Sequence, residues 1–215
     1  GRLGGSALAQ AFGEVGDSPP DVVSPERLRG FFGVMQHLRS RGLVSAYHDR
    51  SDGGLVTTLL EMAFAGRCGL EITLPDAADP MAWLFNEELG AVVQVAPGAE
   101  SAVREAFSAL GLAEHLHFVA ALDPSGAVRI EQSGRTLFAS DRAALQRQWQ
   151  ETTFHMQRLR DEPECAREEL EGVETGGGLI VDLGFDTDDD VAAPFIASGK
   201  RPRVAILREQ GVEIT

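Results

Sequence analysis

Residues 48–55 read HDRSDGGL and bring carboxylates, a hydroxyl group and a Gly pair together within a single turn of chain. The run before them, residues 43–47, predicts a short buried strand, and the run after them, to residue 65, favours a helix. A helix N-terminus presents unpaired N–H groups and a partial positive charge, so Gly53 and Gly54 would let a phosphate approach the backbone closely. These residue types therefore indicate anion chemistry at a strand-to-helix turn.

Asp49 lies directly before this turn and could supply a hard oxygen to a Mg²⁺ ion bridging the same phosphate, because Mg²⁺ prefers carboxylate and phosphate oxygens. A simpler interpretation is structural: Ser51 or Asp52 caps the helix, and the two glycines only make the turn. The eight residues alone leave both interpretations open, because caps of this kind are far commoner than nucleotide sites.

A second Gly-rich loop, Gly4-Gly5-Ser6, lies near the start of the chain. Alone it is a weak signal. Beside the first loop it predicts a lid or cradle for phosphate, with the Ser6 hydroxyl and the following N–H groups as donors.

Other ionisable residues allow both chemical and structural interpretations. Glu87 and Glu88 could act as acid, base or metal ligand, but we favour a structural role in which one orders a loop and the other faces water. His48 could touch a substrate phosphate, yet strand alternation sends either His48 or Asp49 toward the core. The acidic run at 186–190 lacks the Gly and the terminal Glu of a calcium loop at the right offsets, so we interpret it as a solvated linker.

The elements that must position these residues follow from capping and periodicity. Ser24 and Pro25 begin a helix that Gly42 ends. From residue 43 to about 122 the predicted order is βαββαβ, which is typical of a ferredoxin-like α/β arrangement: one mixed or antiparallel sheet with helices on one face. Predicted strands are 43–48, 70–74, 91–95, 117–121 and 128–131, with a further short strand-like run at 179–183. Later helices are predicted at 54–65, 100–110 and 141–160. A solvated helix or linker is expected at 162–174.

Composition narrows the class of protein. A hydrophobic content of 43% over 215 residues excludes wholesale disorder, and no apolar run approaches the roughly 20 residues of a membrane span. A formal charge of −14 would repel nucleic acid and anionic membranes, so neither is an expected partner. Cys68 and Cys165 lie far apart and form no CxxC pair, which favours a reducing, cytoplasmic compartment over a disulfide or zinc framework.

Six segments, in their order and at their intervals, resemble the large single-chain phosphoribosylformylglycinamidine synthase of purine biosynthesis. Besides HDRSDGGL they are RLGGSALAQ at 2–10, EMAFAG at 61–66, LFNEELGAV at 84–92, DVAAPFIA at 190–197 and RVAILREQGV at 203–212. The resemblance covers nearly the whole chain. It departs at the end, where members of the family continue with an Asn and a helix and this chain reads Glu213-Ile214-Thr215.

The resemblance implies an ATP-dependent amidotransferase that converts formylglycinamide ribonucleotide, glutamine and ATP to the amidine, glutamate, ADP and phosphate. Its synthase region is an internal duplication with two related nucleotide sites. By this likeness Asp49 is a Mg²⁺ ligand and Ser51 a nucleotide contact, while the remaining ligands come from an upstream half. Mg²⁺ and ATP or ADP are the implied cofactors, and no residue of this chain is assigned a catalytic role.

The resemblance also implies a division of the chain. Residues 1–140 correspond to a C-terminal domain shared with aminoimidazole ribonucleotide synthetase, 141–200 to a helical, acidic linker, and 201–215 to the start of a glutaminase domain with a first strand at 204–207. We therefore expect a portion of a longer polypeptide, whose partners are its own other domains and small-molecule substrates. Neither Cys68 nor Cys165 has the Gly-flanked turn of a glutaminase nucleophile, so we expect no glutamine hydrolysis.

Two rival classes stay open at this point. The chain could belong to another ATP-dependent enzyme of the same superfamily, although such enzymes would not run on into a glutaminase-like strand. It could also be a non-catalytic interaction module that docks a partner through its acidic surface.

Overall fold

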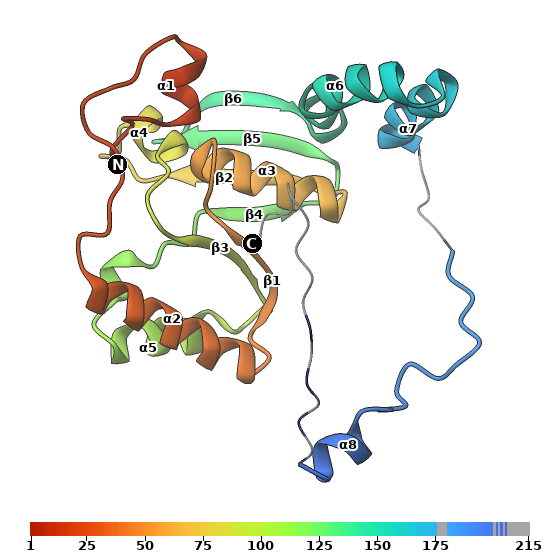
Figure 1. Cartoon of the computed structure of the whole chain (residues 1–215). Coiled ribbons are helices and arrows are strands. Elements are labelled where there is room, and N and C mark those ends of the chain that lie inside the picture. Colours follow the sequence, from red (N-terminus) through yellow and green to blue (C-terminus); the bar gives the residue numbers. More distant parts are fainter. Residues whose placement is uncertain (176–179, 200, 202, 204, 206–215) are drawn as a thin grey trace. The chain divides into compact units, whose positions relative to one another are not determined.

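The computed structural model describes residues 1–175, 180–199, 201, 203 and 205. They belong to two compact units, residues 1–176 and 177–215. The first unit contains two β-sheets with helices packed against them, which confirms the predicted α/β class (Figure 1).

The larger sheet has four strands in the order β4-β2-β5-β6. They are β2 (Gly69–Leu74), β4 (Ala120–Asp123), β5 (Ala127–Gln132) and β6 (Arg135–Asp141). β2 pairs in parallel with β5, and the other pairings are antiparallel. The helix α3 (Gly54–Gly66) places its apolar residues against this sheet, because Leu55, Leu59 and Ala63 form one buried cluster with Ile72 and Ile130. This core fixes the position of α3 and therefore of its N-terminus.

The smaller sheet pairs β1 (Val44–Asp49) with β3 (Ala91–Val95) in antiparallel register, with Asp49 opposite Ala91. Beside it lie α2 (Pro25–Ser40) and α5 (Glu100–Ala109), which Figure 1 shows next to each other. Val34 and Leu38 of α2 form a second core cluster with Val103 and Phe107 of α5.

The division into two sheets differs from the single sheet predicted for residues 43–122. Strand alternation reports which face of a strand is buried, but it carries no information about which strands pair. β1 takes β3 as its partner, while β2 pairs with β4 and β5. The strand expected at 117–121 lies slightly later, at Ala120–Asp123, although the Thr73 amide already donates to Val119 O at 2.9 Å.

Shorter helices connect these layers: α1 (Ala7–Ala11), α4 (Pro80–Phe85) and the 3-10 turn Ala113–His115. The predicted helix at 141–160 is observed as α6 (Arg142–Arg160), capped by the Asp141 carboxylate. α6 packs on α3, where the rings of Phe64 and Trp149 lie 5.7 Å apart. α7 (Pro163–Thr175) follows beside α6, and its Val173 carbonyl accepts hydrogen bonds from Arg67 and Arg142. Both helices fall in the segment predicted as a linker, and both belong to the first unit.

The second unit contains α8 (Ala193–Ala197). Residues 180–183, the described part of a predicted strand at 179–183, are not a strand. In the acidic run, Asp186 and Asp190 accept hydrogen bonds from nearby backbone amides. The strand predicted at 204–207 and the predicted glutaminase start at 201–215 lie outside the described residues, apart from 201, 203 and 205. Within the described ranges no helix is both long enough and apolar enough to cross a membrane.

Candidate functional site

β1 presents Tyr47 and Asp49 on its exposed face and His48 on its half-buried face, as strand alternation requires. The Tyr47 hydroxyl donates a hydrogen bond to Asp49 Oδ1 at 2.5 Å. Burial of the Tyr47 ring, reinforced by the neighbouring carboxylate, raises the pKa of Tyr47 to about 12. At neutral pH the phenol therefore keeps its proton and orients the Asp49 carboxylate, and the Asp49 residue is exposed.

His48 points the other way and makes structural contacts. Its Nε2 lies 3.0 Å from Glu61 Oε2, and Glu61 Oε1 accepts a hydrogen bond of 3.2 Å from the Trp149 indole. This chain of contacts joins β1, α3 and α6. These are the contacts expected of a structural histidine, the second of the two interpretations of His48.

The N-terminus of α3 is built on glycine. Gly53 is the N-cap residue, with φ of 81° and no side-chain cap, and Gly54 has φ of 72°. The alternative interpretation, in which Ser51 or Asp52 caps the helix, is wrong: α3 has no side-chain cap, and Ser51 contributes its carbonyl, which accepts from the Gly54 amide at 2.9 Å. A Cβ at Gly54 would lie 2.6 Å from the Phe85 carbonyl carbon. The helix therefore begins in direct contact with the backbone that follows α4.

Glu87 takes the role that a capping side chain would have. Its Oε1 accepts hydrogen bonds from the Gly53 amide and from the Ala7 amide, both at 2.8 Å. Ala7 is the first residue of α1, so one carboxylate oxygen joins the two Gly-rich loops.

The Gly-rich loop at residues 4–6 is closed on itself. Ser6 is buried and N-caps α1, where its hydroxyl accepts from the Ala9 amide at 3.2 Å and donates to Leu3 O at 2.7 Å. The Gly4 amide donates to Ser18 O and the Gly5 amide to Val15 O. The polar groups of this loop thus already have protein partners, while the exposed Gly5, with φ of 71°, has open space around its Cα.

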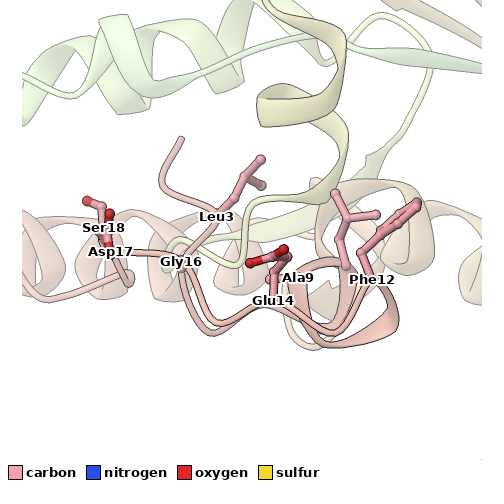
Figure 2. A pocket seen from close by; sticks show the side chains of 9 residues that line it. Leu3, Ala9, Phe12, Glu14, Gly16, Asp17 and Ser18 are labelled. Atoms are coloured by element: carbon pink, nitrogen blue, oxygen red, sulfur yellow. The ribbon is translucent and has the colours of Figure 1, made fainter.

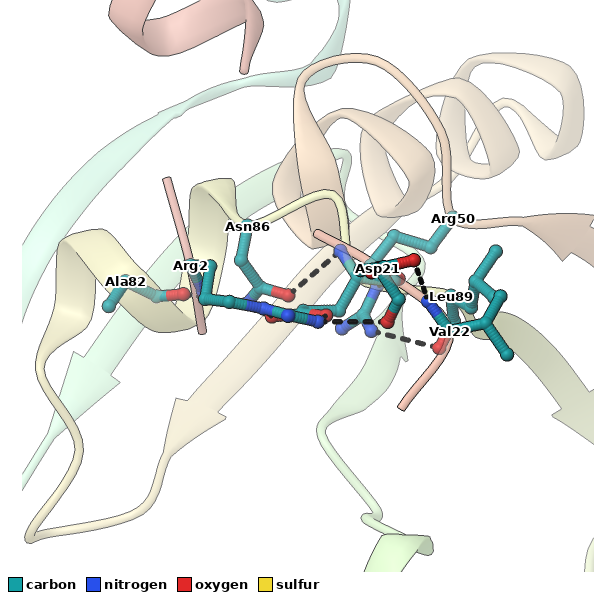
Figure 3. Close-up of polar contacts among 8 residues, drawn as sticks. Arg2, Asp21, Val22, Arg50, Ala82, Asn86 and Leu89 are labelled. Atoms are coloured by element: carbon teal, nitrogen blue, oxygen red, sulfur yellow. Dashed lines mark hydrogen bonds and ion pairs between the residues drawn. The ribbon is translucent and has the colours of Figure 1, made fainter. Parts of the chain in front are cut away.

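Glu88 binds the segment before this loop. Its carboxylate accepts from Arg2 Nε at 2.7 Å and Arg2 Nη2 at 2.6 Å, and this pairing holds the pKa of Glu88 below its usual value. Arg50 donates to the carbonyls of Glu88 and Leu89, and burial lowers the pKa of Arg50. Figure 3 shows Arg2, Arg50 and Asn86 converging at this turn. The Glu87 and Glu88 carboxylates therefore both hold loops. The expectation that one of these two residues orders a loop while the other faces water is wrong.

A pocket of about 370 Å³ lies beside the Gly-rich loop at residues 4–6 (Figure 2). Leu3, Ala9 and Phe12 supply apolar surface to it, and Glu14 and Asp17 supply carboxylates. A larger groove of about 1840 Å³ is lined by Tyr47 and His48 of β1 and by Arg50, and its lining does not include Asp49.

The side chains of Asp49, Ser51 and Asp52 are exposed at the strand-to-helix turn. Asp49 lies at the end of β1 and is oriented by Tyr47, and the Ser51 hydroxyl has no hydrogen-bond partner among the described residues. Among all the residues that the structure describes, no group of three or more His, Cys, Asp or Glu side chains is placed so that it could hold a metal ion. A single exposed carboxylate fits one ligand of a Mg²⁺ ion whose other ligands are phosphate oxygens, water or other protein groups.

Both cysteines are free thiols. Hydrogen bonding to Glu162, with further nearby carboxylates, raises the pKa of the exposed Cys165 thiol. A raised pKa keeps Cys165 in the unreactive thiol form, the opposite of what a nucleophile needs.

Sequence reasoning identified the two loops but missed the contacts that join them. Glu87 lies 80 residues from Ala7 and 34 from Gly53, so no local pattern reports either contact. The Arg2 to Glu88 pair spans 86 residues.

Comparison with known proteins places this geometry in a wider context. Residues 1–132 match the family model described as AIR synthase related protein, C-terminal domain. Among solved structures, the chain is similar to phosphoribosylformylglycinamidine synthase II from Thermotoga maritima, with 18% identity and a TM-score of 0.51 over 67% of this chain. It is also similar to T. maritima PurL complexed with ATP, with 21% identity and a TM-score of 0.50 over 67% of this chain, and to the same protein complexed with AMPPCP, with 20% identity and a TM-score of 0.50 over the same share.

These likenesses concern the fold. In each case the aligned region covers 24% of the T. maritima chain, so this chain spans about a quarter of the length of those proteins.

Proposed function

Because the chain belongs to the family of AIR synthase related proteins, through their C-terminal domain, we propose that it contributes one side of a Mg²⁺-nucleotide site. We propose further that the parent enzyme is an ATP-dependent ligase of purine biosynthesis that converts formylglycinamide ribonucleotide, glutamine and ATP to the amidine, glutamate, ADP and phosphate. The fold of PurL, which is described in complexes with ATP and AMPPCP, supports this proposal.

The observation that carries the proposal is the exposed Asp49 carboxylate at the end of β1, next to the N-terminus of α3. Its Oδ1 is held by the Tyr47 hydroxyl, which leaves the other oxygen for a cation. A bound Mg²⁺ would neutralise phosphate charge during transfer of the terminal phosphoryl group. Asp49 would hold that ion from one side, and water, phosphate and other parts of the parent protein would complete its six ligands.

Of the remaining site residues, Ser51 would contact the nucleotide directly, and the residues of the two Gly-rich loops would shape the site. The Ser51 hydroxyl is exposed beside Asp49 and would donate to a phosphate oxygen. Gly53 and Gly54 already use their amides within the protein, so their contribution is the compact turn that brings the positive end of α3 near the ligand. Gly4, Gly5 and Ser6 would form the facing loop, with the bare Cα of Gly5 as its open surface.

Calorimetric titration of the full chain with ATP, with Mg²⁺ and then with excess chelator, tests this proposal. We expect ATP to bind more tightly with Mg²⁺ than without it, by about tenfold in affinity, which corresponds to about 1.4 kcal/mol. Asp49→Asn should remove most of this difference, because it removes an anionic ligand of the ion. Asp52→Asn is the matched control, because Asp52 is an exposed carboxylate of the same turn with the same charge change. A Mg²⁺ effect that is equal in both variants, or no binding by the unmodified chain, would contradict the proposal.

A further inference from the structure

Glu87 is the one carboxylate in the described residues whose single oxygen, Oε1, accepts hydrogen bonds from the starts of two helices, at Ala7 of α1 and Gly53 of α3. Both distances are 2.8 Å. An ionised acceptor is favoured at a helix N-terminus, because it satisfies a free N–H group and interacts with the positive end of the helix. Hydrogen bonds to charged acceptors are also stronger than neutral ones.

Neighbouring contacts fix Glu87 in this place. The Asn86 side chain donates to Ala82 O at 2.6 Å, which anchors the turn to the end of α4. Gly54 packs so closely on this turn that a Cβ there would lie 2.7 Å from Asn86 O. On the other side of Glu87, Glu88 binds Arg2. The turn formed by residues 86–88 therefore contacts both Gly-rich loops and is itself tied to α4.

We propose that Glu87 is a positioning residue that holds the two Gly-rich loops at a fixed separation, and that the nucleotide site depends on this separation. Glu87 does not itself contact the ligand in this account, because its Oε1 is occupied by the two amides. The second half of the proposal rests on the proposed nucleotide site, whereas the first half concerns the chain without ligand.

Hydrogen exchange of the full chain without nucleotide tests the first half. In Glu87→Ala we expect the amides of Ala7 and Gly53 to exchange at least about tenfold faster, because each loses a charge-assisted hydrogen bond. Glu87→Gln keeps an acceptor oxygen at the same length and should retain most of the protection. Glu71→Ala, which removes an exposed carboxylate on β2, is the control and should leave both loops unchanged. Unchanged exchange in a folded Glu87→Ala variant, or faster exchange at only one loop, would overturn the proposal.

Ala7→Pro provides a second variant that removes only a donor. Proline lacks the N–H group and is well tolerated at the first position of a helix. The preceding residue, Ser6, already has extended dihedrals, with φ of −65° and ψ of 158°, which proline requires of its neighbour. If Glu87→Ala does not fold, this variant decides the question: protection in α1 should fall while the Gly53 amide stays protected by Glu87. Equal protection of α1 in Ala7→Pro and the unmodified chain would refute the link.

Nucleotide titrations test the second half. We expect Glu87→Ala and Ala7→Pro to weaken MgATP binding at least about tenfold and adenosine binding much less, because a loop-positioning effect acts on the phosphates, and Glu87→Gln should restore it. Equal losses for MgATP and adenosine, or no loss, would overturn the positioning role. The unmodified chain could bind no nucleotide while Glu87→Ala still speeds hydrogen exchange at both Ala7 and Gly53. In that case the proposed function fails, and the first half of the proposal, that Glu87 holds the two loops together, stands.

Discussion

Replacing Gly54 by alanine should destabilise the fold more than Gly5→Ala, the same substitution in the other Gly-rich loop. Gly54 has φ of 72°, and its added Cβ would lie 2.6 Å from the Phe85 carbonyl carbon and 2.7 Å from Asn86 O. Both of these neighbours are backbone atoms, so neither can rotate away. Either α3 or the turn after α4 must move.

The expected magnitude has three parts. A non-glycine residue in the left-handed region costs about 1–2 kcal/mol. Forcing an extra carbon into a packed contact adds about 1–3 kcal/mol. The smaller conformational entropy of alanine in the unfolded chain offsets about 0.4–1 kcal/mol. Gly5→Ala is the matched control: its φ is 71°, and nothing lies within 4 Å of the added Cβ, so it carries the first and third parts only.

Urea unfolding followed by tryptophan fluorescence measures the difference, because both tryptophans, Trp83 and Trp149, lie in the first unit. At equal m-values, Gly54→Ala should lose about 1–3 kcal/mol more free energy of unfolding than Gly5→Ala. Equal losses in the two variants would refute the close contact between the start of α3 and residues 85–86.

Three further predictions concern titration and reactivity. Tyr47 is the only tyrosine, and its pKa is raised from 10.0 to about 12. The contribution of this shift to stability is therefore present below pH 10 and lost between about pH 10 and 12. Ultraviolet titration should show tyrosinate forming at a higher pH than for a free tyrosine, and at a lower pH in Asp49→Asn than in the unmodified chain. Because the pKa of Glu88 is lowered by Arg2, its contribution is present above its ordinary pKa and lost as pH falls through the lower folded value; the unfolding free energy of Glu88→Gln should vary less with acid pH, and an unchanged acid profile would contradict this. The chain should release no glutamate from glutamine, and activity abolished by Cys68→Ala or Cys165→Ala would contradict the assignment of both thiols as non-catalytic.

Local signals in the sequence were enough for the elements with strong caps and periodicity. Ser24 and Pro25 begin α2, as predicted. The helix predicted at 141–160 is α6, which begins one residue later because Asp141 is its N-cap. Two local signals were overlooked. Asp79 and Pro80 mark the start of α4 by the same rule. Ser133 and Gly134, both with positive φ, form the two-residue turn between β5 and β6.

Partners far apart in the chain could not be predicted in this way. The pairing of β1 with β3 and the choice of Glu87 as acceptor for two helix starts depend on how separate layers pack. The alternative interpretation of Ser51 or Asp52 as an N-cap is wrong for the same reason, because a carboxylate distant in the chain accepts the hydrogen bond of the Gly53 amide. Strand alternation predicted that His48 and Asp49 lie on opposite faces of β1, but it did not predict which of the two is exposed.

The most direct test of the central claim is to locate the metal on the protein. Mn²⁺ can replace Mg²⁺ with ATP, and its unpaired electrons broaden the backbone amide NMR signals of nearby residues. We predict that broadening by Mn²⁺ with ATP is strongest at residues 49–54, extends to the loop at residues 4–6, and disappears from both in Asp49→Asn. Broadening centred elsewhere, or unchanged in Asp49→Asn, would contradict a metal–nucleotide site at the junction of β1 and α3.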